Sequence, residues 1–142
     1  MVENSIIVLD ASVAVKWYLS DKEGDLEEAL LLKESFLDKN IFLLVPQHFL
    51  SEFSNTIFRK FPQHALSVFS DLQNFKIPFV VLSLEVASLA GILMKKYPKI
   101  SFYDAAYHAL AMHKEGTFVT ADEQYYKTTK KEGHILLLKN YK

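Results

Sequence analysis

The sequence contains no cysteine, and its 142 residues include only four glycines, four prolines and one tryptophan. Without cysteine the chain forms no disulfide framework, no thiolate metal site and no cysteine nucleophile, and it suits a reducing compartment such as the cytoplasm. Little glycine and proline leaves no stretch that resembles a flexible linker or a low-complexity segment. No basic region precedes the first apolar segment, so we expect no secretory signal.

Apolar residues are abundant, at 50% of the chain against 23% charged residues. This composition supports a packed core, and the length fits a single domain spanning residues 1–142. The most apolar stretch, residues 77–94, has one acid at Glu85 and approaches the length of a membrane span. Pro78 and a change from strand-like to helical spacing instead predict a buried strand followed by an amphipathic helix, and no span.

The formal net charge of -1 conceals an asymmetry between the two halves of the chain. Residues 1–71 carry 6 Lys and Arg against 11 Asp and Glu, whereas residues 72–142 carry 10 against 6, giving charges of -5 and +4. Two interpretations are open: solvated helix faces, or a basic C-terminal face that meets a polyanion. Lys127, Lys130 and Lys131 are compatible with both.

Strand-like and helix-like segments alternate along the chain. Short apolar runs predict strands at residues 5–9, 41–45, 79–82, 117–120 and 134–138. Helical spacing predicts helices from about residue 12 and at residues 25–39, 47–60, 63–74, 84–97, 101–115 and 123–132. The alternation predicts a mostly parallel sheet with helices on both faces, and a functional site beyond the carboxyl ends of the strands.

Helix boundaries follow from capping residues. Ser20 and Glu23 form a capping-box pattern before helix 25–39, Ser101 caps the helix at 101–115, and Gly116 is expected to end that helix. The inner face of helix 25–39 is expected to consist of Leu26, Ala29, Leu30, Phe36 and Leu37.

Four acids lie at or near the ends of the predicted strands. Asp10 directly follows the first strand, Asp122 lies two residues after the fourth, Asp104 is in the first turn of helix 101–115, and Glu52 is early in helix 47–60. Acids in first helical turns also serve as capping residues, and Glu52 alone resembles a solvated helix residue. Asp10 is different, because an acid at the end of a buried strand must be paired or bound to a metal.

On one edge of a sheet, four carboxylates would repel one another and raise their pKa values unless a cation neutralised them. Oxygen ligands without cysteine suit Mg²⁺ or Mn²⁺, and such ions support phosphodiester hydrolysis. His108 lies four residues after Asp104 and shares its helical face, but we favour a surface or packing role over metal binding. The other histidines show no spacing typical of a metal site or a catalytic triad.

Four segments carry these acids in order. The run from Val8 to Tyr18 includes Asp10, and residues 46–59 include Glu52 and Asn55. The third and fourth segments are Ser101-Phe102-Tyr103-Asp104-Ala105 and Thr120-Ala121-Asp122-Glu123. Together they resemble the motifs of PIN-domain proteins, specifically the VapC toxins of type II toxin–antitoxin modules, and the resemblance extends over residues 6–138.

The resemblance implies an α/β fold, a three-layer α/β/α sandwich with a five-stranded, mostly parallel sheet. It implies a metal-dependent ribonuclease site, with Mg²⁺ or Mn²⁺ at the acids Asp10, Glu52, Asp104 and Asp122. By the same resemblance, the supporting residues are Ser12 and Thr120 as hydroxyls at the edge of the site, Asn55 as a polar neighbour of Glu52, and Glu123 as either a fifth acid or a helix N-terminal residue.

The resemblance also implies an RNA substrate, a homodimer and a VapB-type antitoxin whose basic segment enters the acidic site. We expect antitoxin contact within residues 41–59, where the helices containing Phe49, Phe53 and Phe58 offer aromatic surfaces. A further apolar stripe is expected in the core or at a dimer contact; it consists of Tyr103, Tyr107, Leu110 and Ala111.

Three other functional classes fit a small domain of this kind. A phosphoryl-accepting receiver domain requires an acid where this chain has Ser83, and a phosphohydrolase of the haloacid dehalogenase type requires one where it has Ser12. Both are therefore disfavoured. A catalytically inactive PIN-like module that binds protein or RNA remains the alternative to a ribonuclease.

Overall fold

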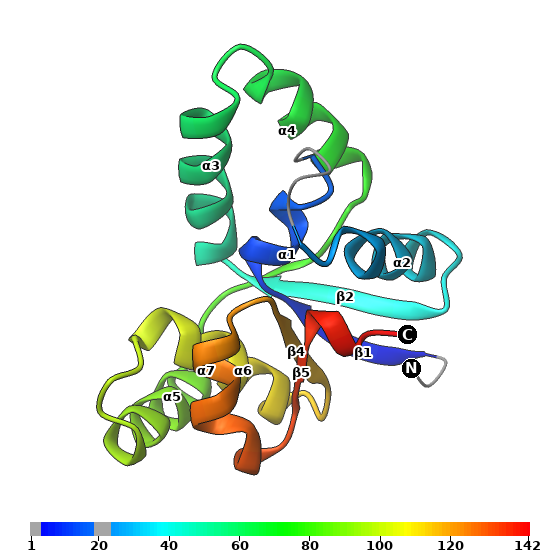
Figure 1. The fold of residues 1–142 in the computed structure, drawn as a ribbon. Helices are drawn as coiled ribbons and strands as arrows, with labels where there is room; N and C mark the ends of the chain where they lie inside the picture. The colour runs from blue at the N-terminus through cyan, green and yellow to red at the C-terminus, as the bar shows by residue number, and fades with distance from the viewer. Residues whose placement is uncertain (1–3, 19–23) are drawn as a thin grey trace.

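The computed structural model describes residues 4–18 and 24–142, and its strands form one five-stranded sheet (Figure 1). The strands are β1 (Ser5–Leu9), β2 (Ile41–Pro46), β3 (Phe79–Val80), β4 (Thr117–Thr120) and β5 (Ile135–Leu137). They lie in the order β3-β2-β1-β4-β5, and every neighbouring pair is parallel. The predicted α/β fold with a five-stranded, mostly parallel sheet is confirmed.

Helices cover both faces of this sheet. They are α1 (Ala11–Val15), α2 (Leu26–Leu37), α3 (His48–Lys60), α4 (Ala65–Asn74), α5 (Leu84–Lys96), α6 (Phe102–His113) and α7 (Glu123–Thr129), with 3₁₀ segments η1 (Lys130–Glu132) and η2 (Leu138–Asn140). Helices α1 to α4 lie on one side of the sheet and α5 to α7 on the other, which gives three layers (Figure 1). Parallel neighbours require such crossover helices.

Strand β1 is central because its apolar run is suited to burial on both faces. Ile7, Val8 and Leu9 are fully buried, and β1 pairs with β2 on one side and with β4 on the other. The chain therefore changes direction across the sheet at β1, and the carboxyl ends of β1 and β4 lie next to each other. At this edge the backbone N–H of Asp10 donates to the carbonyl oxygen of Val119 at 3.2 Å. Such a switch point is where open parallel sheets place their sites.

Helix α2 presents a different face to the core from the one expected. Ala29 and Leu32 are buried, whereas Leu30 and Leu37 are exposed. The helix has five leucines distributed around its axis, so apolar periodicity alone does not identify the buried face. The capping-box pattern of Ser20 and Glu23 lies outside the described residues.

Gly116 does not end helix α6 as expected. The helix ends at His113, and the residue in the left-handed region after it is Glu115, with φ 55°. Gly116 instead allows close packing of β4 on β1, because a Cβ atom at this position would lie 2.5 Å from the carbonyl oxygen of Ile6. The glycine is therefore required by the approach of two strands and not by a helix cap.

The aromatic residues of α3 are less available for a partner than expected. Phe49 and Phe53 are fully buried in the core, and only Phe58, at 48% exposure, reaches the surface. The helix packs these rings inward because Phe49, Phe53 and Ile57 repeat at intervals of four residues and share one face. Of the expected aromatic surface of α3, only Phe58 is exposed, and the aliphatic Leu50 is the other large apolar side chain that this helix exposes.

The apolar stretch at residues 77–94 divides into strand β3 and most of helix α5, as the change in spacing predicts. Within the described parts of the chain, no helix has both the length and the apolar character needed to cross a membrane.

Candidate functional site

Asp10 is the most buried of the four acids, at 7% exposure, and it caps helix α1. One carboxylate oxygen accepts from the backbone N–H of Ser12 at 3.2 Å, and the other accepts from the Thr120 hydroxyl at 2.7 Å. Burial raises the pKa of Asp10 to about 7; these two hydrogen bonds oppose the rise, while the charges of Asp104 and Glu52 add to it. The carboxyl is held firmly and its charged form is costly.

Thr120 connects Asp10 to the end of strand β4. Its hydroxyl donates to Asp10 and accepts from the backbone N–H of Asp122 at 3.1 Å. Asp122 then caps α7, because its carboxylate accepts from the backbone N–H of Tyr125 at 3.0 Å. The expected position of Thr120 at the edge of the site therefore corresponds to a buried hydroxyl that links two of the acids.

Asp104 enters the site from the opposite layer. The Ser101 hydroxyl accepts from the backbone N–H of Asp104 at 3.1 Å, which fixes the first turn of α6. The pKa of the Asp104 carboxyl is raised, mainly by burial and further by the charges of Asp122 and Glu52. Asp104 is thus within electrostatic reach of acids that come from α3 and from the end of β4.

Glu52 is positioned by Tyr107, which the sequence pattern assigns only to an apolar stripe. The hydroxyl of Tyr107 donates to the Glu52 carboxylate at 2.6 Å, although α3 and α6 belong to different layers. Tyr107 is fully buried, and burial, the charge of Asp10 and this hydrogen bond raise its pKa. The sequence feature that could have identified Tyr107 as a site residue is its spacing. It lies three residues after Asp104 and therefore on a similar face of α6.

His48 completes the contacts around Glu52. Its ring lies edge-on to that of Tyr107, with centroids 4.6 Å apart, and its Nε2 lies 3.1 Å from the Tyr103 carbonyl oxygen and 4.0 Å from Glu52. Burial lowers the pKa of His48, and the charge of Glu52 opposes the change. Tyr103 itself is largely exposed, so only the rest of the predicted apolar stripe lies in the core.

The remaining predicted residues lie around these acids in different roles. Ser12 supplies a backbone donor to Asp10. Asn55 accepts from the guanidinium of Arg59 at 3.1 Å and makes no hydrogen bond to Glu52. Glu123 is exposed in the first turn of α7 and pairs with Lys139 at 3.1 Å, which lowers its pKa. Glu123 thus behaves as a helix N-terminal residue with its own cation.

His108 is fully buried and lies in packing, in agreement with the preferred interpretation. Its Nδ1 is 2.9 Å from the Tyr125 hydroxyl, and its Nε2 is 2.8 Å from the carbonyl oxygen of Gly133. Burial lowers its pKa. His108 therefore ties α6, which carries Asp104, to α7, which begins after Asp122.

The donor chemistry of the four acids fits a hard cation. Asp10 and Asp104 have raised pKa values that a bound cation would lower, and the side-chain atoms that these acids offer as metal ligands are all oxygens. Nevertheless, residues 4–18 and 24–142 contain no group of three or more acidic or histidine side chains that could hold a metal ion as they stand. Asp10, Glu52 and Asp122 each accept hydrogen bonds from protein neighbours, with which a cation would compete.

Comparison with known proteins identifies a family and a fold. The sequence matches the PIN-domain family model over residues 7–131. A toxin–antitoxin complex from Klebsiella pneumoniae is similar in structure, with a TM-score of 0.70, 13% identity, and coverage of 93% of this chain and 97% of that one. VapC20 of Mycobacterium tuberculosis, a sarcin–ricin-loop-cleaving toxin, matches with a TM-score of 0.66 and 15% identity, over 90% of this chain and 95% of VapC20. VapBC2 from Rickettsia felis, bound to a promoter DNA fragment, matches with a TM-score of 0.65 and 16% identity, over 93% of this chain and 96% of that one. No curated protein sequence matches this chain.

Proposed function

The chain belongs to the PIN-domain family, and from this premise we propose that it is a cytoplasmic, metal-dependent endoribonuclease, the toxin of a type II toxin–antitoxin pair. The observation that carries the proposal is the buried carboxyl of Asp10 at the sheet's switch point, with a pKa raised to about 7 beside Asp104 and Glu52. Asp10 and Asp122 cap helices, but four acids at one edge of the sheet repel one another. A bound cation would offset this repulsion, which supports the proposal.

Asp10, Glu52, Asp104 and Asp122 would hold Mg²⁺ or Mn²⁺, which activates water and neutralises charge on a phosphodiester. The chain itself orients the acids. Thr120 aligns Asp10 and the backbone of Asp122, and Tyr107 aligns Glu52. Fixed carboxylates reduce the reorganisation that the reaction requires.

Water attacks phosphorus and the P–O3′ bond breaks, so the 3′ oxygen leaves and takes up a proton, and the 2′-hydroxyl of RNA is not involved. The products should therefore carry 5′-phosphate and 3′-hydroxyl ends. Single-stranded or looped RNA is the favoured substrate, because a splayed strand reaches a carboxylate site more easily than a continuous duplex does.

The proposal is tested by incubating wild-type protein, Asp10→Asn and the control Asp38→Asn with single-stranded RNA, in Mg²⁺, Mn²⁺ or excess EDTA. Asp38 is a suitable control because it is exposed at the C-terminus of α2. We expect wild type and Asp38→Asn to cleave only with metal, and Asp10→Asn to be inactive. Cyclic 2′,3′-phosphate ends or activity in EDTA would refute the mechanism, and a folded wild type that binds RNA without cleaving it would support the inactive-module alternative.

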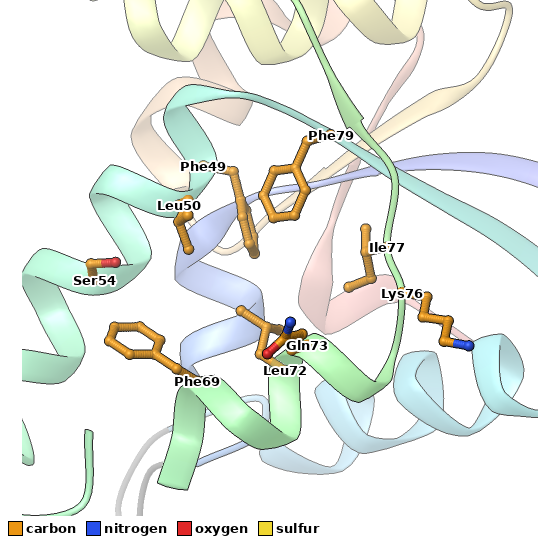
Figure 2. Close-up of a pocket in the computed structure, with 9 residues that line it drawn as sticks. All are labelled: Phe49, Leu50, Ser54, Phe69, Leu72, Gln73, Lys76, Ile77 and Phe79. Carbon is orange, nitrogen blue, oxygen red and sulfur yellow. The ribbon is translucent and has the colours of Figure 1, made fainter. Parts of the chain in front are cut away.

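The antitoxin is proposed to combine basic and apolar side chains. The acids attract Arg or Lys, and the half of the chain that contains α1 to α4 carries a net charge of -5. Helices α3 and α4 of this acidic half, together with Lys76, Ile77 and Phe79, line a mainly apolar cavity of about 510 Å³. Figure 2 shows its lining residues: Phe49, Leu50, Ser54, Phe69, Leu72, Gln73, Lys76, Ile77 and Phe79. Three of them belong to residues 41–59, where antitoxin contact is expected.

We expect the antitoxin's apolar side chains to enter this cavity while its cation reaches the acids and blocks RNA. The test titrates the protein with the product of the small reading frame adjacent to its gene and follows cleavage and complex mass together. Leu50→Glu should weaken the complex about tenfold or more, whereas Leu66→Glu, on the exposed face of α4, should not. Cleavage that persists in a stable complex would contradict active-site blocking.

A homodimer is the remaining part of the proposal. Val81, directly after β3, and Leu84, the first residue of α5, are apolar side chains at 77% and 86% exposure that a second copy would cover. We expect a dimer at micromolar concentration and a monomer for Leu84→Glu. A wild-type protein that is strictly monomeric would contradict the dimer.

A further inference from the structure

Two cavities meet at Asp122. The first has a volume of about 570 Å³ and is lined by Lys96, Tyr97, Pro98, Lys99, Ile100, Ser101, Asp104, Asp122, Gln124, Tyr125 and Thr128. The second has a volume of about 310 Å³ and is lined by Ser12, Val15, Lys16, Thr56, Lys60, Ala121 and Asp122. Each cavity thus combines two lysines with residues at or next to the acidic site, and Asp122 belongs to both.

The two lysines of the first cavity differ in whether their charge is already paired with an acid. Lys96 pairs with Glu132 at 3.0 Å, and the Tyr97 hydroxyl also donates to Glu132, so this charge is already offset. Lys99 is exposed, and within residues 4–18 and 24–142 it makes no hydrogen bond or ion pair. Lys99 is therefore the cation of this cavity that is available to an anionic ligand.

Electrostatics explain why a nuclease site needs such cations. RNA carries one negative charge per nucleotide, and the acids that surround Asp104 repel it. A cation at the scissile phosphate neutralises the acids there but not the phosphates of the flanking nucleotides. Lysines on both sides of the acids provide that charge where a single strand enters and leaves.

We propose that single-stranded RNA crosses the acidic site between these two cavities, and that the nucleotide beside the scissile phosphate occupies the first cavity with its phosphate at Lys99. The volume is within the range of small-molecule sites, and the amide of Gln124 offers a donor and an acceptor to a base or ribose. This inference rests on the proposed ribonuclease function and identifies where its substrate lies.

The test measures binding separately from cleavage. In the Asp10→Asn background, the Kd for a labelled single-stranded RNA is measured over a range of salt concentrations for Lys99→Ala and for the control Lys95→Ala. Lys95 is an exposed lysine of α5 that lines neither cavity. We expect Lys99→Ala to raise the Kd about fivefold and to reduce the salt slope by about 0.7 to 1, and Lys99→Arg to restore both. Lys95→Ala should change neither.

Lys60→Ala tests the second cavity in the same way, and the double variant with Lys99→Ala should lose the product of the two factors. In the otherwise wild-type enzyme, Lys99→Ala should raise KM by the factor seen in Kd and leave kcat unchanged. Equal Kd values for Lys99→Ala and Lys95→Ala would overturn the nucleotide site, and an unchanged Kd for Lys60→Ala would overturn the crossing. A wild-type protein without nuclease activity would refute the proposed function, while the binding measurements would still decide the path of RNA.

Discussion

Replacing Asp10 by Asn should stabilise the metal-free protein at neutral and alkaline pH. The pKa of Asp10 rises from 3.8 in the unfolded chain to about 7 in the folded protein because the carboxyl is buried. Between these values the folded state keeps a proton that the unfolded state releases. Stability is therefore lost as the pH rises from about 4 to about 7, and it stays at its lower level above that range.

The size of the effect follows from the pKa change. A rise from 3.8 to about 7 corresponds to a penalty of about 4 kcal/mol for the charged form. Asparagine removes the charge but satisfies the donors Ser12 N–H and Thr120 Oγ1 less well, which costs about 1 kcal/mol. We therefore expect Asp10→Asn to increase the free energy of unfolding by about 3 kcal/mol at pH 8 and to have little effect near pH 4.

The assay is urea unfolding of wild type and Asp10→Asn in EDTA at several values of pH. The difference between the two proteins isolates Asp10 from other titrating groups. A difference that does not change between pH 4 and pH 8, or a variant less stable than wild type at pH 8, would refute the assignment of a costly buried charge.

Three further predictions concern contacts within the fold. Tyr107→Phe, which removes the hydrogen bond to Glu52, should cost about 1 kcal/mol in urea unfolding and lower kcat for RNA cleavage about tenfold, and unchanged kcat would show that Glu52 needs no anchor. Gly116→Ala should lower the free energy of unfolding by about 1 to 3 kcal/mol, because its Cβ would collide with Ile6 on β1, and an unchanged melting temperature would contradict this. His108→Ala leaves a cavity and unpairs the Gly133 carbonyl and the Tyr125 hydroxyl, so calorimetry should show a loss of about 3 kcal/mol or more.

The fold was largely predictable because its signals are local. The apolar run of β1, the alternation of strands with helices and the cap at Ser101 each act within a few residues. Parallel strands place their carboxyl ends at one edge, so the proximity of Asp10 to the end of β4 follows from the same reasoning.

Contacts between layers were not predictable in this way. The bond between Tyr107 and Glu52 depends on how α3 and α6 are rotated about their axes, and a single sequence does not specify that rotation. The same applies to the core face of the leucine-rich α2 and to the burial of Phe49. Gly116 shows a related limit, since its role depends on a strand more than a hundred residues earlier in the chain.

The central claim, that the four acids form one cation site, is tested most directly by calorimetric titration of Mn²⁺ into wild type, Asp10→Asn, Asp104→Asn and the control Asp38→Asn. We expect wild type and Asp38→Asn to bind with equal affinity, and each site variant to bind at least tenfold more weakly. Binding to wild type should also release protons at pH 7, because a cation lowers the raised pKa of Asp10. Equal affinity in all four proteins, or no binding to wild type, would contradict the claim.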